Sequence, residues 1–295
     1  MAEEEEIPEL TTEEKLDIAK KLLLQSPPGE ILQVASDVKT LLGDDKLLNG
    51  IASEVFKQYN TEQMIVVTLP DSEDKALVTT AGEIDATHYL DPRSGQVLTV
   101  DHIKQVCTEL RPAEEKENTP AEAQPYRKSL QDAVTNYVKD SFPSAEFAVY
   151  GTISGSNPSL TLCISSSKFS PKNYWNGRWR STWTAALSGD KSSWNVTGEI
   201  QVVVHYFEEG NVQLDTKHDV TLTLKAKDEA ADAAALTAEI AKTEQEYLAN
   251  LEETYSNLSE TTFKDLRRTL PVTRTKFPWA QVQHSLASEL KRNAK

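Results

Sequence analysis

The chain has 295 residues, of which 38% are hydrophobic and 26% charged, and its formal net charge is -15. This is the composition of a soluble globular protein with enough chain to bury a sizeable core. No apolar run approaches the ~18 residues that a membrane helix needs, and acids stand at the N-terminus where a signal peptide has basic residues, so we expect a cytoplasmic protein. The two cysteines are too few for a disulfide framework.

The charge is distributed unevenly along the chain. From Lys264 to Lys295 there are eight Lys and Arg against two Asp and Glu, a net of +6, so residues 1–263 carry -21. The stretch LRRTLPVTRTKFPW, residues 266–279, has cations and no acid. An acidic body with a basic tail suggests an acidic partner for the tail and a body that repels nucleic acid.

Three short helices are expected at the N-terminus. Thr11 and Glu14 form a capping-box pattern, in which each side chain bonds the other residue's backbone N–H. The helix that follows stops in SPPGE, residues 26–30, because proline cannot continue a helix. Helical periodicity predicts two more helices over 31–42 and 46–59. Short helices joined by tight turns predict a small antiparallel bundle.

The middle of the chain changes to a strand pattern. Between residues 64 and 100 the apolar period is two, in IVVTL, KALVTT and QVLTV, which predicts short hairpins. The segment 111–125 is rich in Glu, Ala and Pro and is expected to be a solvated loop. Helical spacing then predicts a helix over 126–142.

Residues 146–224 contain five strand patterns, most clearly the alternation of Ile200, Val202 and Val204. Because no helix-length segment separates these strands, they are expected to pair as an antiparallel meander with one face free to be covered. Cys163 lies in the apolar pattern SLTLCISS, where a buried thiol is expected.

A long helix is expected to provide that cover. Residues 227–270 contain no Pro or Gly, and roughly forty residues at ~1.5 Å each make a helix of about 60 Å, longer than one sheet is wide. We therefore expect it to project beyond its own subunit and to end at Pro271. The residues after it have one apolar stripe at helical spacing. This stripe consists of Trp279, Val282, Leu286 and Leu290.

Two interpretations of this tail remain open. A terminal amphipathic helix can dock on its own body. Alternatively, it can be a detachable helix that enters a groove on a partner, with the cations before it attracting an acidic surface.

The sequence offers no convergent catalytic set. The five histidines show no metal-ligand spacing, and neither a Cys-x-x-Cys nor a Gly-rich phosphate loop occurs. We therefore expect a protein that is not an enzyme and that has no cofactor or metal.

An aromatic and basic tract, KNYWNGRWRSTW, covers residues 172–183 and holds three of the five tryptophans. Its Asn-Gly pair predicts a tight turn leading into a strand. Interleaved Arg and Trp could stack on single-stranded nucleic acid. In the other interpretation Trp179 and Trp183 face the core while Arg178 and Arg180 lie on the opposite face. The acidic body favours the second interpretation.

Four tracts carry a family resemblance. The chain resembles the alpha subunit of F-actin capping protein in four tracts, which occur in the same order in that family. In chain order they are SPPGE, HYLDPRSG, NYWNGRWRSTW and LRRTLPVTRTKFPW, and the last two resemble the family closely. The similarity spans nearly the whole chain. The resemblance implies an α+β fold with an N-terminal three-helix bundle, a short β-hairpin region, a five-stranded antiparallel sheet under a long helix, and an amphipathic extension called a tentacle. The corresponding division of this chain is 1–60, 61–101, 102–225, 226–270 and 271–295.

The resemblance also implies partners. Members form an obligate heterodimer with a beta subunit of similar fold, related by a pseudo-two-fold axis, whose strands join into one ten-stranded sheet. The heterodimer caps the barbed end of the actin filament and blocks gain and loss of subunits without calcium or nucleotide. The alternative from another class is a nucleic-acid-binding or membrane-surface protein that uses the same basic tract.

In the family, basic residues at the base of the tentacle contact actin and are the site where acidic phosphoinositides inhibit capping. Carried over by position, they are Lys264, Arg268 and Arg274, with Arg267 and Lys276 as neighbours in the same tract. Beyond Trp279 the chain departs from the family pattern, since Ser-Leu-Ala-Ser at 285–288 stands where other members have further lysines.

Overall fold

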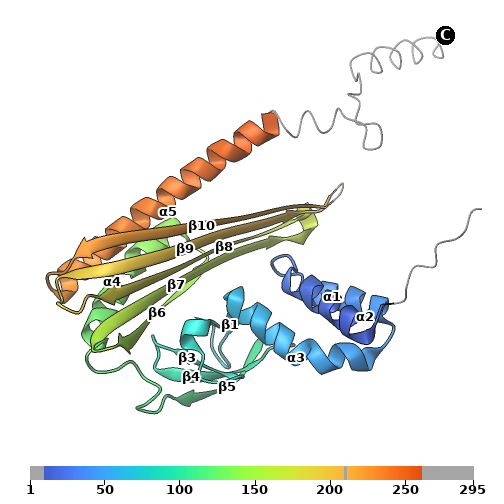
Figure 1. The fold of residues 1–295 in the computed structure, drawn as a ribbon, viewed down its shortest axis with the longest axis horizontal. Helices are drawn as coiled ribbons and strands as arrows, with labels where there is room; N and C mark the ends of the chain where they lie inside the picture. Colours follow the sequence, from blue (N-terminus) through green and yellow to red (C-terminus); the bar gives the residue numbers. More distant parts are fainter. Residues whose placement is uncertain (1–9, 209–210, 261–295) are drawn as a thin grey trace, which may run out of the picture. The chain divides into compact units, whose positions relative to one another are not determined.

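The computed structural model of the chain describes residues 10–208 and 211–260. The chain divides into two compact units, residues 1–238 and 239–295. The elements follow one another in the order expected from the sequence (Figure 1). The helices are α1 (Thr12–Leu24), α2 (Ile31–Leu42), α3 (Asp45–Glu62), α4 (Gln124–Ser141) and α5 (Glu229–Glu260), with single 3-10 turns η1 (Thr80–Gly82) and η2 (Pro171–Asn173).

The N-terminal helices form the expected bundle. The capping box is present: Glu14 N–H donates to Thr11 Oγ1 at 3.3 Å, and Thr11 N–H donates to Glu14 Oε2 at 2.8 Å. Gly43, with a φ of 64°, ends α2 in the left-handed conformation that favours glycine. Helix α3 runs three residues past the predicted end, because no Gly or Pro interrupts it before Met64 takes a φ of 45°. The buried apolar side chains of the bundle form one cluster, which includes Leu23, Ile31, Val38, Val55 and Tyr59.

Two small sheets follow the bundle. β1 (Val66–Thr68) pairs with β2 (Lys75–Leu77), and β3 (His88–Asp91), β4 (Gln96–Asp101) and β5 (Val106–Pro112) form a three-stranded sheet. Strand β5 corrects two expectations, because the hairpin region continues past residue 101 and the predicted loop from residue 111 begins within a strand. Most residues of β5 are exposed or half-buried, so its sequence lacks the alternation that marks a strand.

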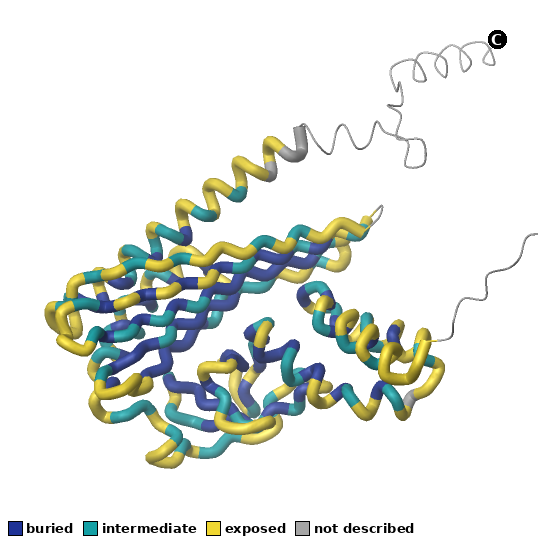
Figure 2. The backbone as a smooth tube through the Cα atoms, in the orientation of Figure 1, coloured by how far each residue is buried: buried dark blue, intermediate teal, exposed yellow. Residues whose placement is uncertain are grey.

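The large sheet is the predicted five-stranded antiparallel meander. Each strand pairs with its neighbour in sequence, in the order β10-β9-β8-β7-β6. The buried residues concentrate on its central strands (Figure 2). Its strands are β6 (Ala145–Ser154), β7 (Asn157–Ser170), β8 (Trp175–Leu187), β9 (Ser193–Tyr206) and β10 (Val212–Lys225).

The two faces of this sheet have different covers. On one face the rings of Trp179 and Phe142 stack with centroids 5.4 Å apart, which places the end of α4 against β8. The first turns of α5 join the same layer, since Trp194 Nε1 donates to Asp232 Oδ2 at 2.8 Å. The other face receives the end of the N-terminal bundle and strand β2, whose Leu77 packs in one buried cluster with Ala148, Tyr150 and Cys163 of the large sheet. The predicted end of the long helix at Pro271 lies outside the described residues.

One cross-strand pair in this sheet leaves no room for a side chain. Gly198 of β9 is directly opposite Trp183 of β8, and a Cβ atom on Gly198 would lie 2.3 Å from the indole ring. We expect Gly198→Ala to lower the free energy of unfolding by about 3 kcal/mol, because Trp183 is buried on all sides and cannot move away. Urea denaturation measures this. Gly189→Ala is the matched control, because a Cβ there meets open space. Equal midpoints for the two variants would contradict the close packing.

Candidate interaction surfaces

The aromatic and basic tract lies on β8. Trp179 and Trp183 belong to the face that α4 covers and are 7% and 1% exposed. Arg178 and Arg180 alternate with them on the opposite face and are 6% and 8% exposed. The interpretation that places the tryptophans in the core is therefore confirmed. Buried indole rings cannot stack on bases, so these two side chains form no nucleic-acid platform.

The turn before this strand lies earlier than the sequence suggests. Asn176 and Gly177 are inside β8, and the chain reverses in Pro171–Asn173 and at Tyr174, whose φ is 58°. The prediction of an Asn-Gly turn was wrong because the asparagine has a different partner. Its Nδ2 donates to Glu30 Oε1 at 2.7 Å.

A largely buried carboxylate joins the N-terminal bundle to the sheet. Glu30, the N-cap residue of α2, has Oε1 2.7 Å from Nδ1 of His205 on β9. The other ring nitrogen of His205 lies 3.0 Å from Asn211 Oδ1, next to the first residue of β10. The side chains of His205 and Glu30 are 7% and 13% exposed, so water competes little for these bonds. One polar network thus connects α2, β8, β9 and the beginning of β10.

Arg178 makes a second connection between these parts. Its Nε donates to Ser167 Oγ at 3.0 Å, and its Nη1 donates to the backbone oxygen of Gln63 at 3.2 Å, just past the end of α3. The guanidinium also lies over the Phe169 ring, 5.8 Å from its centroid. Burial lowers the pKa of Arg178. Its Nε and Nη1 atoms both donate within the chain, so Arg178 acts as a structural residue.

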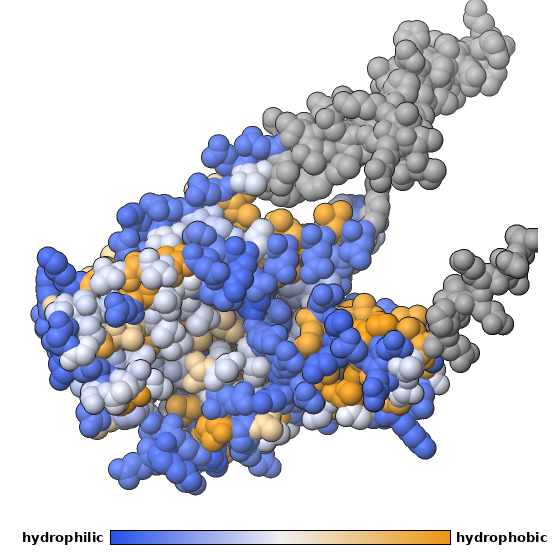
Figure 3. All heavy atoms as spheres, in the orientation of Figure 1, coloured by the Kyte–Doolittle hydropathy of each residue, from blue (hydrophilic) through white to orange (hydrophobic). Residues whose placement is uncertain are grey.

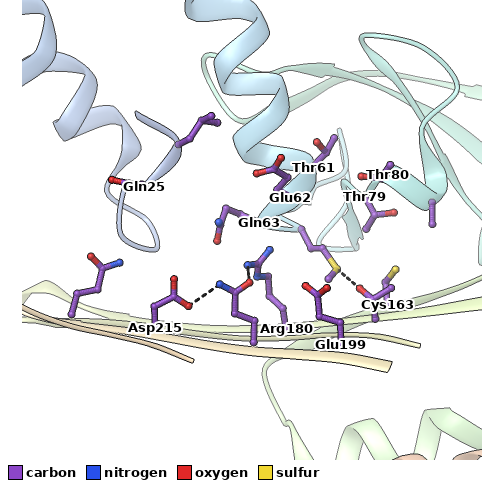
Figure 4. Close-up of a pocket in the computed structure, with 16 residues that line it drawn as sticks. Gln25, Thr61, Glu62, Gln63, Thr79, Thr80, Cys163, Arg180, Glu199 and Asp215 are labelled. Carbon is purple, nitrogen blue, oxygen red and sulfur yellow. Dashed lines mark hydrogen bonds between the residues drawn. The ribbon is translucent and has the colours of Figure 1, made fainter. Parts of the chain in front are cut away.

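Arg180 faces a cleft of about 710 Å³ between the sheet, the ends of α1 and α3, and η1. Figure 4 shows Arg180, Glu199 and Asp215 rising from the sheet toward the side chains at the end of α3. Arg180 Nη2 donates to Gln201 Oε1, and Gln201 Nε2 donates to Asp215 Oδ1 at 2.8 Å. Burial and the charge of Arg178 lower the pKa of Arg180 to about 10, so it is still a cation at neutral pH.

Strand β10 is an open edge of the large sheet. It is 14 residues long, and no strand within residues 10–208 and 211–260 pairs with its outer side. Ala226 N–H donates to Ser192 O, which continues the β9–β10 pairing by one residue. Because hydrogen-bonded pairs alternate along an antiparallel pair of strands, the even-numbered residues of β10 form the backbone hydrogen bonds to β9. The odd-numbered residues from 213 to 225 therefore direct their backbone N–H and C=O groups outward. A long edge of this kind is a template for pairing with another chain.

A second surface lies on the N-terminal helices. Figure 3 shows apolar side chains gathered over α1 and α2. Exposed apolar groups that gather in this way mark sites of protein contact. The exposed large apolar residues of this segment are Leu10, Ile18, Leu22, Leu32 and Leu41.

Two side chains with potential chemistry, His102 and Cys163, are buried in the fold. His102 is buried and lies within hydrogen-bond distance of Asn60 and Tyr89. Cys163 is buried as predicted, and burial raises the pKa of its thiol to about 12. No group of three His, Cys, Asp or Glu side chains among the described residues is placed to hold a metal ion. None of the described helices has the length and apolar character needed to cross a membrane.

Comparison with known proteins decides the family. The sequence profile of the F-actin capping protein alpha subunit matches residues 19–289. The F-actin-capping protein subunit alpha of Arabidopsis thaliana is 41% identical over 293 residues, covering 96% of this chain and 94% of the relative. The chain belongs to the F-actin capping protein alpha subunit family. The capping protein alpha subunit of Dictyostelium discoideum is 39% identical and covers 95% of this chain and 99% of the relative.

The fold agrees with this family. A solved structure of the homodimeric actin capping protein alpha subunit from Plasmodium berghei superposes with a TM-score of 0.73, covering 88% of this chain and 98% of that one. Its sequence identity is 22%, so this likeness concerns the fold. The capping protein alpha subunits are actin-binding, cytoskeletal proteins, as the resemblance of the four tracts implies.

The residues that the capping-protein resemblance assigns to actin and lipid contact lie outside the described residues, and so does the apolar stripe of the tentacle. The structure instead brings together residues that the sequence does not connect, in particular Glu30, Asn176 and His205, and the cleft around Arg180. Alternation along β8 indicates which face its arginines share, but the partners on that face come from distant segments. The predicted site residues that the structure does not describe are Lys264, Arg267, Arg268, Arg274, Lys276, Trp279, Val282, Leu286 and Leu290.

Proposed function

We propose that this chain is the alpha subunit of a heterodimer that binds the barbed end of the actin filament and blocks subunit addition and loss there, without calcium. The observation that carries the proposal is the family match over residues 19–289, which includes the basic tract. The chain then acts by binding alone, as a subunit of the actin cytoskeleton in the cytoplasm. Nothing in the described residues requires a catalytic step for this role.

The proposed partner is the capping protein beta subunit. The open edge of β10 supports this assignment, because its outward backbone groups match what the edge strand of a second subunit of similar fold would offer. Antiparallel pairing there makes one sheet of ten strands. The apolar surface on α1 and α2 is a further area that the beta subunit can cover.

The proposed actin contact is the basic tract at the base of the tentacle. Lys264, Arg268 and Arg274, with Arg267 and Lys276 beside them, provide cations in a chain whose first 263 residues carry -21. Clustered cations raise the rate of association with an acidic surface, and the actin filament is acidic. Acidic phosphoinositides compete for the same cations, so we propose that they inhibit capping.

The test is elongation from actin filament seeds, followed by pyrene fluorescence, with the chain co-expressed with a beta subunit. The heterodimer should stop barbed-end growth at substoichiometric amounts relative to actin monomer. Normal growth in its presence would overturn the proposal. Sub-micromolar binding of single-stranded RNA without an effect on actin ends would support the nucleic-acid function instead.

Removing residues 271–295 should separate the tail's contribution from the fold. We expect the truncated heterodimer to form and to melt within a few degrees of the full one, because the deletion leaves the elements of the described residues in place. Its capping should be weaker by about tenfold or more, since cations and the apolar stripe are both lost. Loss of the heterodimer on truncation would show that the tail docks on its own body and has a structural role.

A further inference from the structure

The cleft around Arg180 has a buried positive floor. Arg180 lines the cleft and is more than nine-tenths buried, and Arg178, the next residue on the same face of β8, is equally buried but lies outside the cleft. Gln201 is the only hydrogen-bond acceptor for the Arg180 guanidinium within residues 10–208 and 211–260, and no carboxylate of that part of the chain lies within ion-pair distance. A guanidinium has five N–H donors. Several donors of Arg180 are therefore open toward the cleft.

A buried charge without a counter-charge is unfavourable, because the desolvation of the ion is not offset. Glu199 and Asp215 stabilise the Arg180 cation from a distance, but neither forms an ion pair with it. Glu199 pairs with Lys217 at 2.8 Å, and both side chains are about half exposed. Asp215 accepts from Gln201, which stands between it and Arg180. The floor of the cleft consequently matches the charge and geometry of one further carboxylate.

The rim of the cleft limits what can carry this carboxylate. Glu62, Glu199 and Asp215 are exposed around the opening and make the rim acidic. A ligand with several negative charges, such as a nucleotide or a phosphoinositide head group, would be repelled there. A single carboxyl group on a polypeptide side chain can pair with Arg180 at the floor. Neutral or basic residues beside it in the same polypeptide would then face the acidic rim without repulsion.

The cleft opens toward the free edge of the sheet. Gln213 and Asp215 of β10 form one wall, so a chain that pairs with β10 adjoins the opening. In an antiparallel sheet, opposite residues of neighbouring strands point to the same face. A second subunit of similar fold, joined antiparallel at β10, therefore carries its own bundle and small sheets on the same face as this cleft.

Distance then decides which part of the second subunit can reach Arg180. Arg180 lies on β8, and an added strand would be the third neighbour of β8, about 14 Å away at ~4.8 Å per strand. A side chain on the added strand itself is too short for this span. The carboxylate must come from a segment that lies over the face of the sheet.

We propose that the cleft receives an Asp or Glu side chain of the beta subunit, which pairs with the open donors of Arg180. The inference rests on the proposed heterodimer and identifies a contact within it that lies away from the joined strands. Arg180 is then a residue that fixes the orientation of the two subunits, because a buried ion pair with a planar guanidinium is directional.

The experiment compares arginine variants of the co-expressed heterodimer. We expect Arg180→Gln to increase the rate of subunit exchange between differently labelled heterodimers by about tenfold to a hundredfold, because the beta-subunit carboxylate is left buried and unpaired. Arg180→Lys should restore part of the loss. The matched control is Arg127→Gln: Arg127 is 6% exposed on α4, and within the described part of the chain its guanidinium donates to the neutral side chains of Gln124 and Gln131. That variant should lower the melting temperature without a comparable change in exchange.

A second measurement keeps the proposal testable if Arg180→Gln folds poorly. A photo-reactive phenylalanine at Gln213, at the mouth of the cleft, should cross-link to a beta-subunit peptide that contains Asp or Glu. A heterodimer that caps actin but shows unchanged exchange for Arg180→Gln, or that cross-links only within the alpha chain, would overturn this inference and leave the proposed function intact. The melting temperature should also be compared in sodium sulfate and in sodium chloride at equal ionic strength. If sulfate stabilises the wild-type heterodimer but not Arg180→Gln, the anion site is empty in the heterodimer, and this result would also overturn the inference.

Discussion

Replacing Thr221 with proline should weaken the heterodimer strongly and leave the alpha subunit's own sheet paired. Thr221 is odd-numbered in β10, so its N–H points outward, away from β9. Proline removes that donor and places its ring in the path of the partner strand, yet an edge strand tolerates proline where the N–H faces outward. We expect the affinity for the beta subunit to fall by about 3 kcal/mol, on the order of a hundredfold, measured by sedimentation of the co-purified subunits.

Two further variants control for the fold. Thr221→Ala removes the side chain but keeps the N–H, and it should dimerise as the parent does. Leu222→Pro removes an N–H that bonds β9, so it should reduce the yield of folded alpha subunit. If Thr221→Pro and Thr221→Ala bind the beta subunit equally, the partner strand does not pair with β10.

The triple replacement of Lys264, Arg268 and Arg274 with Ala should weaken barbed-end capping and make it less sensitive to salt. The three cations are a large part of the net +6 of the tail, and their attraction for the filament acts at long range in low salt. We expect the association rate with filament seeds to fall by about tenfold at low ionic strength and by less at high KCl. Seeded elongation at the two salt concentrations measures both effects.

The matched control removes three cations further along the tail, in Lys291, Arg292 and Lys295. This variant has the same net charge as the triple replacement, so it separates the position of the cations from their number. Its capping should be reduced less. Equal losses in the two variants would show that only net charge matters, and unchanged capping in the first would remove the role proposed for these residues.

Much of the fold can be predicted because its signals are local. The capping box at Thr11 and the left-handed Gly43 mark helix ends within a few residues. The alternation at Ile200 and Val202 identifies a strand that is buried on one face. The absence of helix-length segments among the five strands correctly predicts a meander, because only hairpins fit such short connections.

The remaining features depend on contacts between distant residues, which leave no periodic pattern. Glu30 meets His205 across 175 positions of sequence and Asn176 across 146. Strand β5 was missed because a strand without a buried residue needs few apolar residues. The cleft at Arg180 likewise exists only once α1, α3 and the sheet are packed together.

The meander topology has a consequence for the synthesis of the subunit. Because each strand of the large sheet pairs with the strand before it, the sheet can assemble from β6 onward as the chain leaves the ribosome. The growing edge of the sheet is covered each time by the next strand to emerge, until β10 ends at Lys225. In the heterodimer that we propose, this 14-residue edge stays exposed until a separately synthesised beta subunit pairs with it. If the chain forms the proposed heterodimer, we expect the solubility of a newly made alpha chain to depend on the local supply of the beta subunit, and surplus alpha chain to be degraded.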